Sequence, residues 1–490
     1  MAIRQFWYAM IFMMLAQHPI VAVASGASQN ALLTKKQLAL LAIAGGVTAT
    51  GVAWKNHYLA PILLNILSYA PEAVLRRTPL WLVYPSLKKT PRGNKAAFAS
   101  PKSPFKPEEK IPIVYRDEYN FSQGGVLNSM LSYLHPFDTQ KYRTIADTII
   151  KWLGVDKSQF FEPLPVSDED LSKVHTPDYL NSLRSSSTIS EIIDMGQLLS
   201  WVPNSFFQNN LLVPMKYAVG GTIEAARLAL KYGWAINLAG GYHHAKAGKG
   251  EGGCVYADIP LALQKLWEVV SDLKVMIIDL DAHQSNGIES MLGNNSKVYI
   301  FDMFNQNVAP VELELLEEKP MYTYDIVQKK LMELESIRPL GKLPNVYAVP
   351  LSGGELSSKV YGISMPDIFY ERCVNRAISA QEYMSKLHEE LPKAYEDCLR
   401  YFGGRRPDLV IYNAGTDIYE DDKWGCMNVD KFGIYDRDRY VFEYVMRDKK
   451  IPILMLPAGG YFKESGRVIG TSIVNIVRNV VVPVLQQKKR

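Results

Sequence analysis

The chain has 490 residues, of which 48% are hydrophobic and 21% charged, the composition of an ordinary globular protein with room for more than one domain. Its formal net charge of +4 is small for this length, so we expect no direct nucleic-acid binding. Its four cysteines lack the spacing of a cysteine-ligated metal site and leave the redox compartment open.

The first 77 residues carry apolar segments. Residues 1–24 combine an early positive charge, a short apolar run and an A-x-A sequence, which predicts a signal peptide or hydrophobic leader. Residues 25–77 are predicted to form a hydrophobic helical segment that anchors the protein to a membrane. Within it, the apolar run 37–54 would make a helix of about 27 Å, enough to cross a bilayer core. The alternative for this run is a buried or interfacial hairpin of the soluble body.

Residues 78–110 are rich in proline and lysine and predict an extended linker, whose positive charge could also touch anionic lipid headgroups. Basic residues lie on both sides of 37–54, so the membrane orientation stays open. We therefore expect a membrane-associated or exported protein whose packed domain spans 111–490.

From Ile111 onward, short apolar runs rich in β-branched residues alternate with helical lengths. A capping-box sequence at Ser167 predicts the start of one helix, and an amphipathic helix is expected over 221–232. Repeated β-then-α units predict an α/β fold with three αβα layers and a mainly parallel central sheet. The expected strands are 113–115, 234–237, 275–278, 298–301, 346–349, 409–412 and 453–456.

Polar residues follow the predicted strand 275–278. Asp281 and His283 are two residues apart, so both can point to the same side, and together they make a zinc-type ligand pair. Taken alone, a D-x-H sequence is more often a capped turn. In a parallel α/β sheet, however, ligands bind beyond the carboxyl ends of the strands. Turns that follow other strands and carry polar side chains should therefore lie close to this pair.

Three further strands end in such turns, each with a neighbouring glycine. They contribute the pair His243 and His244, the carboxylate Asp417 and the phenol of Tyr461. Asp281, His283 and Asp417 would leave zinc an open position, the condition for a catalytic site. A histidine pair can divide the proton transfers, and a tyrosine can donate to an oxyanion, so the set suits amide hydrolysis.

The order of these motifs resembles the histone deacetylase family, and within it the class IV branch, over residues 111–481. The resemblance implies an arginase/deacetylase-like fold and zinc-dependent hydrolysis of the acyl amide of acylated lysine on proteins such as histones. The matching segments are 135–138, 167–179, 220–222, 233–237, 240–244, 256–259, 279–284, 412–417 and 459–461.

By this resemblance, Asp281, His283 and Asp417 bind Zn²⁺, His244 is the general acid/base and Tyr461 donates to the oxyanion. His243 is then the electrostatic partner held by Asp279, and Asn286 orients His244. The family also implies a K⁺ ion bound largely through main-chain carbonyls. Its expected ligands are Asp279, Asp281, His283 and Asp302.

The predicted substrate channel departs from the family. Two aromatic lining positions correspond to Gly253 and Ala309, which should widen the entrance, and Trp424 stands where Leu or Met is common. We expect acyl groups bulkier than acetyl to be accepted, because each additional buried methylene contributes ~0.8 kcal/mol. The alternative is that shifted loops and other side chains fill the space.

Two other functions fit the same residues. One is an amidohydrolase acting on acylated polyamines or other small molecules, which a tight, acidic rim would favour. The other is a membrane-tethered module that binds acyl-lysine without hydrolysing it. An intact ligand set together with Tyr461 argues against the second.

Overall fold

The computed structural model describes residues 103–121, 138, 140–308, 343–353 and 378–488, together with short strands within 355–374. These residues belong to one compact unit, Ala97–Arg490. The predicted leader 1–24, the hydrophobic segment 25–77 with its run 37–54, and most of the linker 78–110 lie outside the described residues. Their structure and membrane role stay predictions.

The last residues of the predicted linker pack on the domain. Phe105 is buried in the hydrophobic core, and the side-chain amide of Gln159 donates to the main-chain oxygens of Lys106 and Glu109, both at 2.9 Å. The packed unit therefore begins before Ile111.

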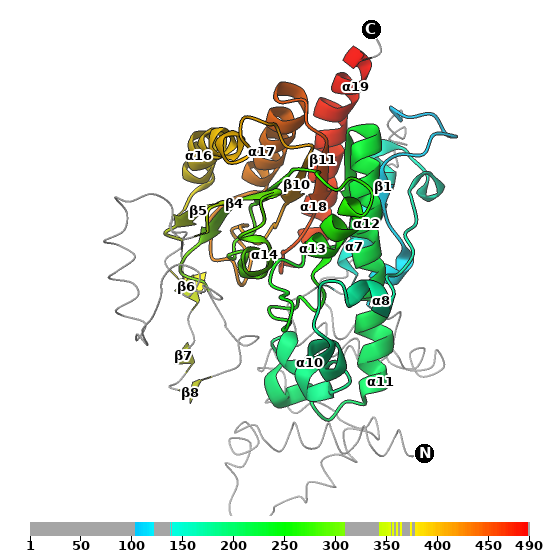
Figure 1. Ribbon diagram of the computed structural model, residues 1–490, viewed down its shortest axis with the longest axis vertical. Coiled ribbons are helices and arrows are strands. Elements are labelled where there is room, and N and C mark those ends of the chain that lie inside the picture. Colours follow the sequence, from blue (N-terminus) through cyan, green and yellow to red (C-terminus); the bar gives the residue numbers. More distant parts are fainter. Residues whose placement is uncertain are drawn as a thin grey trace, which may run out of the picture. The chain divides into compact units, whose positions relative to one another are not determined.

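A seven-stranded parallel sheet forms the centre of this unit (Figure 1). Its order is β1-β2-β11-β10-β3-β4-β5, so the strand that leads to the D-x-H pair, β3, lies near the middle, between β10 and β4. All seven strands were predicted from the sequence. Their bounds are β1 Ile113–Val114, β2 Trp234–Asn237, β3 Val275–Asp279, β4 Val298–Asn305, β5 Val346–Leu351, β10 Leu409–Asn413 and β11 Ile453–Leu456.

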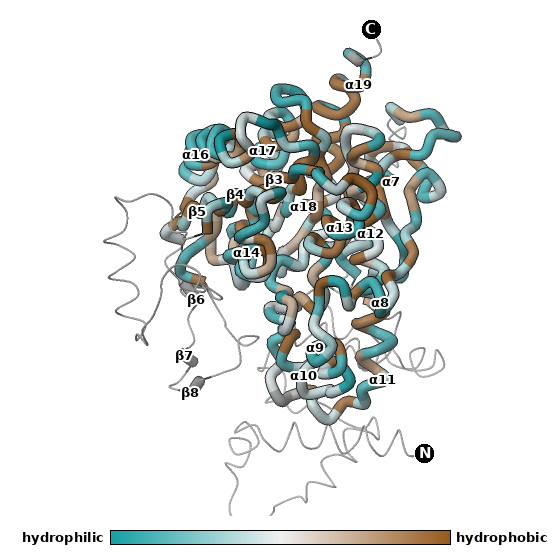
Figure 2. The backbone as a smooth tube through the Cα atoms, viewed as in Figure 1, coloured by the Kyte–Doolittle hydropathy of each residue, from teal (hydrophilic) through white to brown (hydrophobic). Residues whose placement is uncertain are grey.

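Helices cover both faces of the sheet, which makes the three predicted layers. Alternate residues of each central strand enter two separate cores, as Met276 and Ile278 do on one face and Val275 and Ile277 on the other. Figure 2 shows apolar colouring along β3 and α18 and polar colouring on much of α16. The first core is covered by α7 Lys141–Leu153, α16 Ala380–Tyr401, α17 Lys431–Phe442 and α18 Ser465–Ile476, and the second by α12 Val213–Tyr232, α13 Asp258–Trp267 and α14 Asn286–Leu292.

A smaller helical cluster, with its own buried apolar residues, comprises α8 Asp168–Leu171, α9 Pro177–Ser182, α10 Ser186–Ile192 and α11 Asn204–Phe207. The predicted capping box is formed, because the Ser167 hydroxyl accepts from the Asp170 main-chain N–H. The helix expected over 221–232 begins earlier, at Val213. It continues directly from the π-helical turn Gln208–Leu212, and Pro214 lies at this junction, where the helical hydrogen-bond pattern changes.

One described helical stretch, Ser465–Gln487, which includes α18 and α19 Val482–Lys488, is long and apolar enough to cross a membrane, with a mean hydropathy of 1.8. Most of it, 61% of its most apolar window, is buried. Its apolar side is the side of a core helix, since Ile469, Ile473 and Val477 pack into the first core.

Helix α14 packs directly against the main chain of the turn that carries the two adjacent histidines. A Cβ added at Gly287 would lie 2.5 Å from the His244 carbonyl carbon and 2.6 Å from the carbonyl oxygens of His243 and Ala245. These are backbone atoms and cannot rotate away. Only glycine therefore lets α14 approach this turn so closely.

Replacing Gly287 by alanine should destabilise the fold by roughly 1–3 kcal/mol, the usual cost of overpacking. In an unobstructed helix the same change would stabilise by about 0.5–1 kcal/mol. Thermal unfolding of Gly287→Ala and of the control Ser290→Ala, an exposed position on the same helix, measures the difference. A melting temperature at or above wild type for Gly287→Ala would contradict this packing.

Candidate metal centre

The turns that carry the candidate site residues meet at the edge of the sheet formed by the carboxyl ends of the strands. The turn after β2 carries His243 and His244, β3 leads to Asp281 and His283, β10 leads to Asp417, and β11 leads to Tyr461. Since β2, β11, β10 and β3 are consecutive neighbours and all parallel, residues up to 218 positions apart in the chain come together there.

Asp281, His283 and Asp417 form a compact buried triad. Each offers one ligand atom, and these atoms lie within 4.8 Å of one another. His283 Nδ1 is 3.1 Å from Asp281 Oδ1 and 2.9 Å from Asp417 Oδ2. Two carboxylate oxygens and one imidazole nitrogen aimed at one point are a donor set that suits zinc and leaves a coordination position open.

The electrostatics of the triad favour a cation. Burial and the nearby charge of Asp281 raise the pKa of Asp417 to about 7, because two adjacent carboxylates without solvent repel one another. Burial alone would lower the pKa of His283, but its contacts with both carboxylates raise it to about 10. Positive charge between the two carboxylates therefore stabilises the arrangement, and the residues fit a divalent metal ion.

Glycines let the loops that carry the triad crowd together. A Cβ on Gly415 would lie 2.2 Å from Asp281 Oδ2, and one on Gly459 would lie 2.5 Å from the same oxygen. The Gly459 N–H donates to that oxygen at 2.9 Å, and the Ala282 N–H donates to Asp417 Oδ1 at 2.9 Å. The carboxylates are thus held by main-chain donors on their outer sides.

The two adjacent histidines have different partners. His243 Nδ1 donates to Asp279 Oδ2 at 3.1 Å, whereas His244 Nδ1 lies 2.8 Å from the side-chain oxygen of Asn286. Burial would lower the pKa of His243, but the charges of Asp279 and Asp281 raise it to about 9. Burial lowers the pKa of His244 well below its ordinary value, and the neighbouring histidines lower it further.

Tyr461 lies beside His283 of the triad, as His244 also does. Its ring centroid is 6.4 Å from that of His283 and 4.4 Å from that of Trp424, so Trp424 packs against it rather than standing alone at the entrance. Asp422 connects the two, because its carboxylate accepts the main-chain N–H groups of both Trp424 and Tyr461. This carboxylate therefore fixes the position of Tyr461 relative to Trp424.

Of the two positions where a small residue replaces an expected aromatic, the structure describes one, Gly253. Gly253 adopts a left-handed φ of +75°, and a Cβ added there would meet nothing within 4 Å, so the structure has open space at this position. Its neighbour Gly252 approaches the His244 ring closely, since a Cβ there would lie 2.6 Å from His244 Cδ2. Ala309 lies outside the described residues.

Asp302 lies beside Asp279 across the β3–β4 pair and is fully buried. Its Oδ2 accepts the main-chain N–H and the hydroxyl of Ser285, both at 2.8 Å, whereas its Oδ1 has no hydrogen-bond partner. Burial and the charge of Asp279 raise its pKa well above the ordinary value. An unpartnered carboxylate oxygen among buried carboxylates fits the expected potassium position.

Two positioning carboxylates were not assigned a role from the sequence. Asp258 belongs to the matching segment 256–259 but was given no role there. It accepts hydrogen bonds from the main-chain N–H groups of Gly241 and Tyr242 and thereby shapes the turn before the histidines. Asp422 does the same for the tyrosine turn. Their partners are backbone N–H groups, which leave no side-chain pattern in the sequence. The glycine-containing turns that supply those N–H groups are the one local signal that could have pointed to them.

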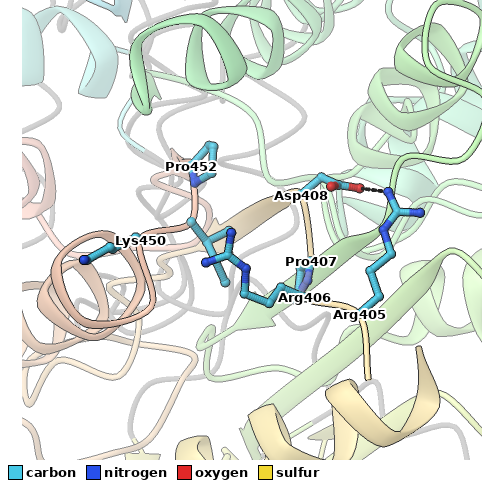
Figure 3. Close-up of a pocket in the computed structure, with 7 residues that line it drawn as sticks. Arg405, Arg406, Pro407, Asp408, Lys450 and Pro452 are labelled. Atoms are coloured by element: carbon cyan, nitrogen blue, oxygen red, sulfur yellow. Dashed lines mark hydrogen bonds and ion pairs between the residues drawn. The ribbon is translucent and has the colours of Figure 1, made fainter. Parts of the chain in front are cut away.

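A separate depression of about 320 Å³ lies among residues that precede β10 and β11, such as Arg406 and Lys450 (Figure 3). In a parallel sheet the residues that precede the strands lie at the edge opposite the triad. This depression therefore does not belong to the metal centre. Arg405, which lines it, is already paired with Asp408 and Asp272.

Comparisons with known proteins agree with this architecture. The family model "Histone deacetylase domain" matches residues 135–477. The chain is 36% identical to "Histone deacetylase 2" of Arabidopsis thaliana over 76% of this chain and 80% of that protein. It is 22% identical to "Histone deacetylase 1" of Homo sapiens over 70% of this chain and 60% of that protein.

The fold is also that of the crystal structure of the HDA15 HD domain, which covers 77% of this chain and 90% of its own, with a TM-score of 0.50 and 18% identity. The predicted arginase/deacetylase-like α/β fold is therefore confirmed, whereas the finer assignment to class IV stays a prediction. From the domain match and the 36% identity, the chain belongs to the histone deacetylase family and is a hydrolase of the amidohydrolase type.

Proposed function

We propose that this protein is a zinc-dependent lysine deacylase that hydrolyses the acyl amide of acylated lysine on proteins such as histones. The observation that carries the proposal is the convergence of Asp281, His283 and Asp417 within 4.8 Å, with His244 and Tyr461 beside them. A bound zinc ion would be held by these three side chains. It would supply Lewis acidity, which polarises a carbonyl and lowers the pKa of water toward ~7.

His244 is suited to proton transfer. With the Asn286 oxygen as acceptor, its Nδ1 carries the proton and its Nε2 remains an acceptor, and its lowered pKa keeps the ring neutral. Nε2 takes a proton from the attacking water, and the same proton then passes to the lysine nitrogen as the C–N bond breaks. The products are a carboxylic acid and a free lysine amine.

Tyr461 and His243 stabilise charge in this proposal. The Tyr461 hydroxyl donates to the oxygen that becomes negative when water adds to the carbonyl. His243, whose pKa is raised to about 9, stays protonated beside Asp279 and Asp281 and balances their charge. We further propose that K⁺ binds near Asp302, through main-chain carbonyls of Asp279, Asp281 and His283, where the unpartnered Asp302 oxygen supports a monovalent cation.

The acyl preference proposed for this site is for chains longer than acetyl. The open space at Gly253 supports it, because a channel wall without a side chain leaves room for additional methylenes. Trp424 limits that room on the Tyr461 side, where it packs at 4.4 Å.

We also propose that the N-terminal 77 residues bring the domain to a membrane or into an export pathway, on the strength of their apolar runs alone.

Substituting His244 by alanine should lower kcat/KM on a fluorogenic acyl-lysine peptide roughly 10²- to 10⁴-fold without loss of zinc, because His244 transfers protons and does not bind metal. Asp417→Asn should lose both zinc and activity. Metal content by elemental analysis, measured beside the rates, separates the two effects. His388→Ala, an exposed histidine that contacts the Tyr440 ring edge-on, is the control and should match wild type.

The proposal fails if folded wild-type protein holds no transition metal after purification and zinc addition, or if His244→Ala retains wild-type turnover.

Wild-type protein should prefer octanoyl- and myristoyl-lysine to acetyl-lysine. Each methylene that the channel fully buries would raise kcat/KM by about fourfold, from ~0.8 kcal/mol per methylene. Trp424→Leu, which removes ring area beside Tyr461, should increase the ratio of long-chain to acetyl activity. Steady-state rates on a series of acyl-lysine peptides test this, and a strong preference for acetyl would refute it.

Membrane association is tested by fractionating cells that express the tagged full chain and a variant lacking residues 1–77. We expect the full chain in the membrane fraction or the secreted fraction and the shortened chain in neither. Equal distribution of both would contradict the proposed role of the N-terminal segment.

A further inference from the structure

Arg437 is a fully buried cation beneath the metal centre. It lies on α17, whose exposed residues include Lys431, Asp436 and Arg439, yet its own side chain is 0% exposed and turns inward toward the sheet. A buried guanidinium is costly unless its donors are satisfied by charged or main-chain acceptors. The identity of those acceptors indicates what it does.

Three of its acceptors are main-chain oxygens of the loops that carry the metal ligands. Arg437 Nη1 donates to Leu280 O at 3.2 Å and to Gly415 O, and Nη2 donates to Ala414 O at 3.3 Å. Leu280 directly precedes Asp281, and residues 414–415 directly follow β10 on the way to Asp417. One planar group therefore joins the two loops that must hold their carboxylates next to one another.

The guanidinium is itself held in place. Its Nε donates to Asp438 Oδ1 at 2.9 Å, and Asp438 in turn accepts the hydroxyls of Tyr412 on β10 and Ser472 on α18. Arg437 lies 5.9 Å from the Tyr412 ring centroid, measured from its Cζ. These contacts come from three different elements, so the group has little freedom to follow a loop that moves.

We propose that Arg437 is a positioning residue that sets the spacing of Asp281 and Asp417, and thereby the metal affinity and the turnover of the site. This inference rests on the proposed metal-dependent function. The rigid fork of arginine presents several donors in fixed directions, which matches three carbonyls from two loops. A lysine would keep the charge but could not span them together.

The matched test compares Arg437→Lys with Arg405→Lys. Arg405 makes two ion pairs with a partly exposed side chain, and because it precedes β10 it lies at the opposite edge of the parallel sheet. Figure 3 shows its pair with Asp408. The dissociation constant for Zn²⁺, measured by chelator competition on the full-length protein, should rise roughly 10- to 100-fold for Arg437→Lys, the range typical of lost partners behind metal ligands. Arg405→Lys should leave it unchanged.

Two further readouts separate positioning from a general loss of stability. The visible spectrum of the Co²⁺-substituted protein reports ligand geometry and should change in Arg437→Lys, and kcat should fall while KM changes little. If Arg437→Lys does not fold, the double variant Arg437→Met/Asp438→Asn, which leaves no buried charge unpaired, takes its place with the same expectations.

A folded variant at position 437 with wild-type metal affinity and an unchanged Co²⁺ spectrum would overturn the inference and leave the proposed function intact. If the wild-type protein binds no metal at all, the proposed function fails first, and the positioning role fails with it.

Discussion

Four carboxylates buried together at the end of three neighbouring strands are the constraint on which the rest of this structure depends. Asp279, Asp281, Asp302 and Asp417 are each at most 1% exposed. Without water to solvate them, their mutual repulsion must be offset by positive charge from nearby groups. His243 stands against Asp279. Between Asp281 and Asp417, the positive charge comes from a protonated His283 without a metal and from the metal ion itself when His283 binds it. Arg437 lies below the two ligand loops. The cations proposed at the triad and at Asp302 complete this balance.

The fold places these groups where they can be used. Parallel strands end at one edge, so β3, β4 and β10 deliver their carboxylates to a common point with almost no loop length between strand and site. The main-chain N–H groups of Ala282 and Gly459 face the carboxylates from outside, which leaves the inner oxygens pointed at the centre. The carboxylates can lie this close together only if the loops that carry them pack closely. The glycines at 415 and 459 permit that approach.

Much of this could be predicted from the sequence because the signals are local. The strands that lead to the site are buried on both faces and are therefore continuous apolar runs in the sequence, and the ligand residues follow these runs within a few positions. The longer reach of α12 and the role of Arg437 could not be predicted in this way. Arg437 lies in the charged stretch Asp436–Arg439, which is typical of a solvated helix face, and its acceptors are carbonyl oxygens of distant loops. Main-chain acceptors carry no residue-type signature, so only the three-dimensional structure identifies them.

The same balance of charge explains why the two adjacent histidines, His243 and His244, can differ in protonation. Their rings are 4.0 Å apart, so two imidazolium ions there would repel one another strongly. Asp279 supplies negative charge to His243, whereas Asn286 offers His244 an acceptor without charge. A carboxylate at position 286 would raise the pKa of the His244 ring and so favour a second proton on the pair. The amide at Asn286 is therefore as much a part of the proposed mechanism as the acid at Asp279, because the difference between them keeps one ring charged and the other free to accept a proton.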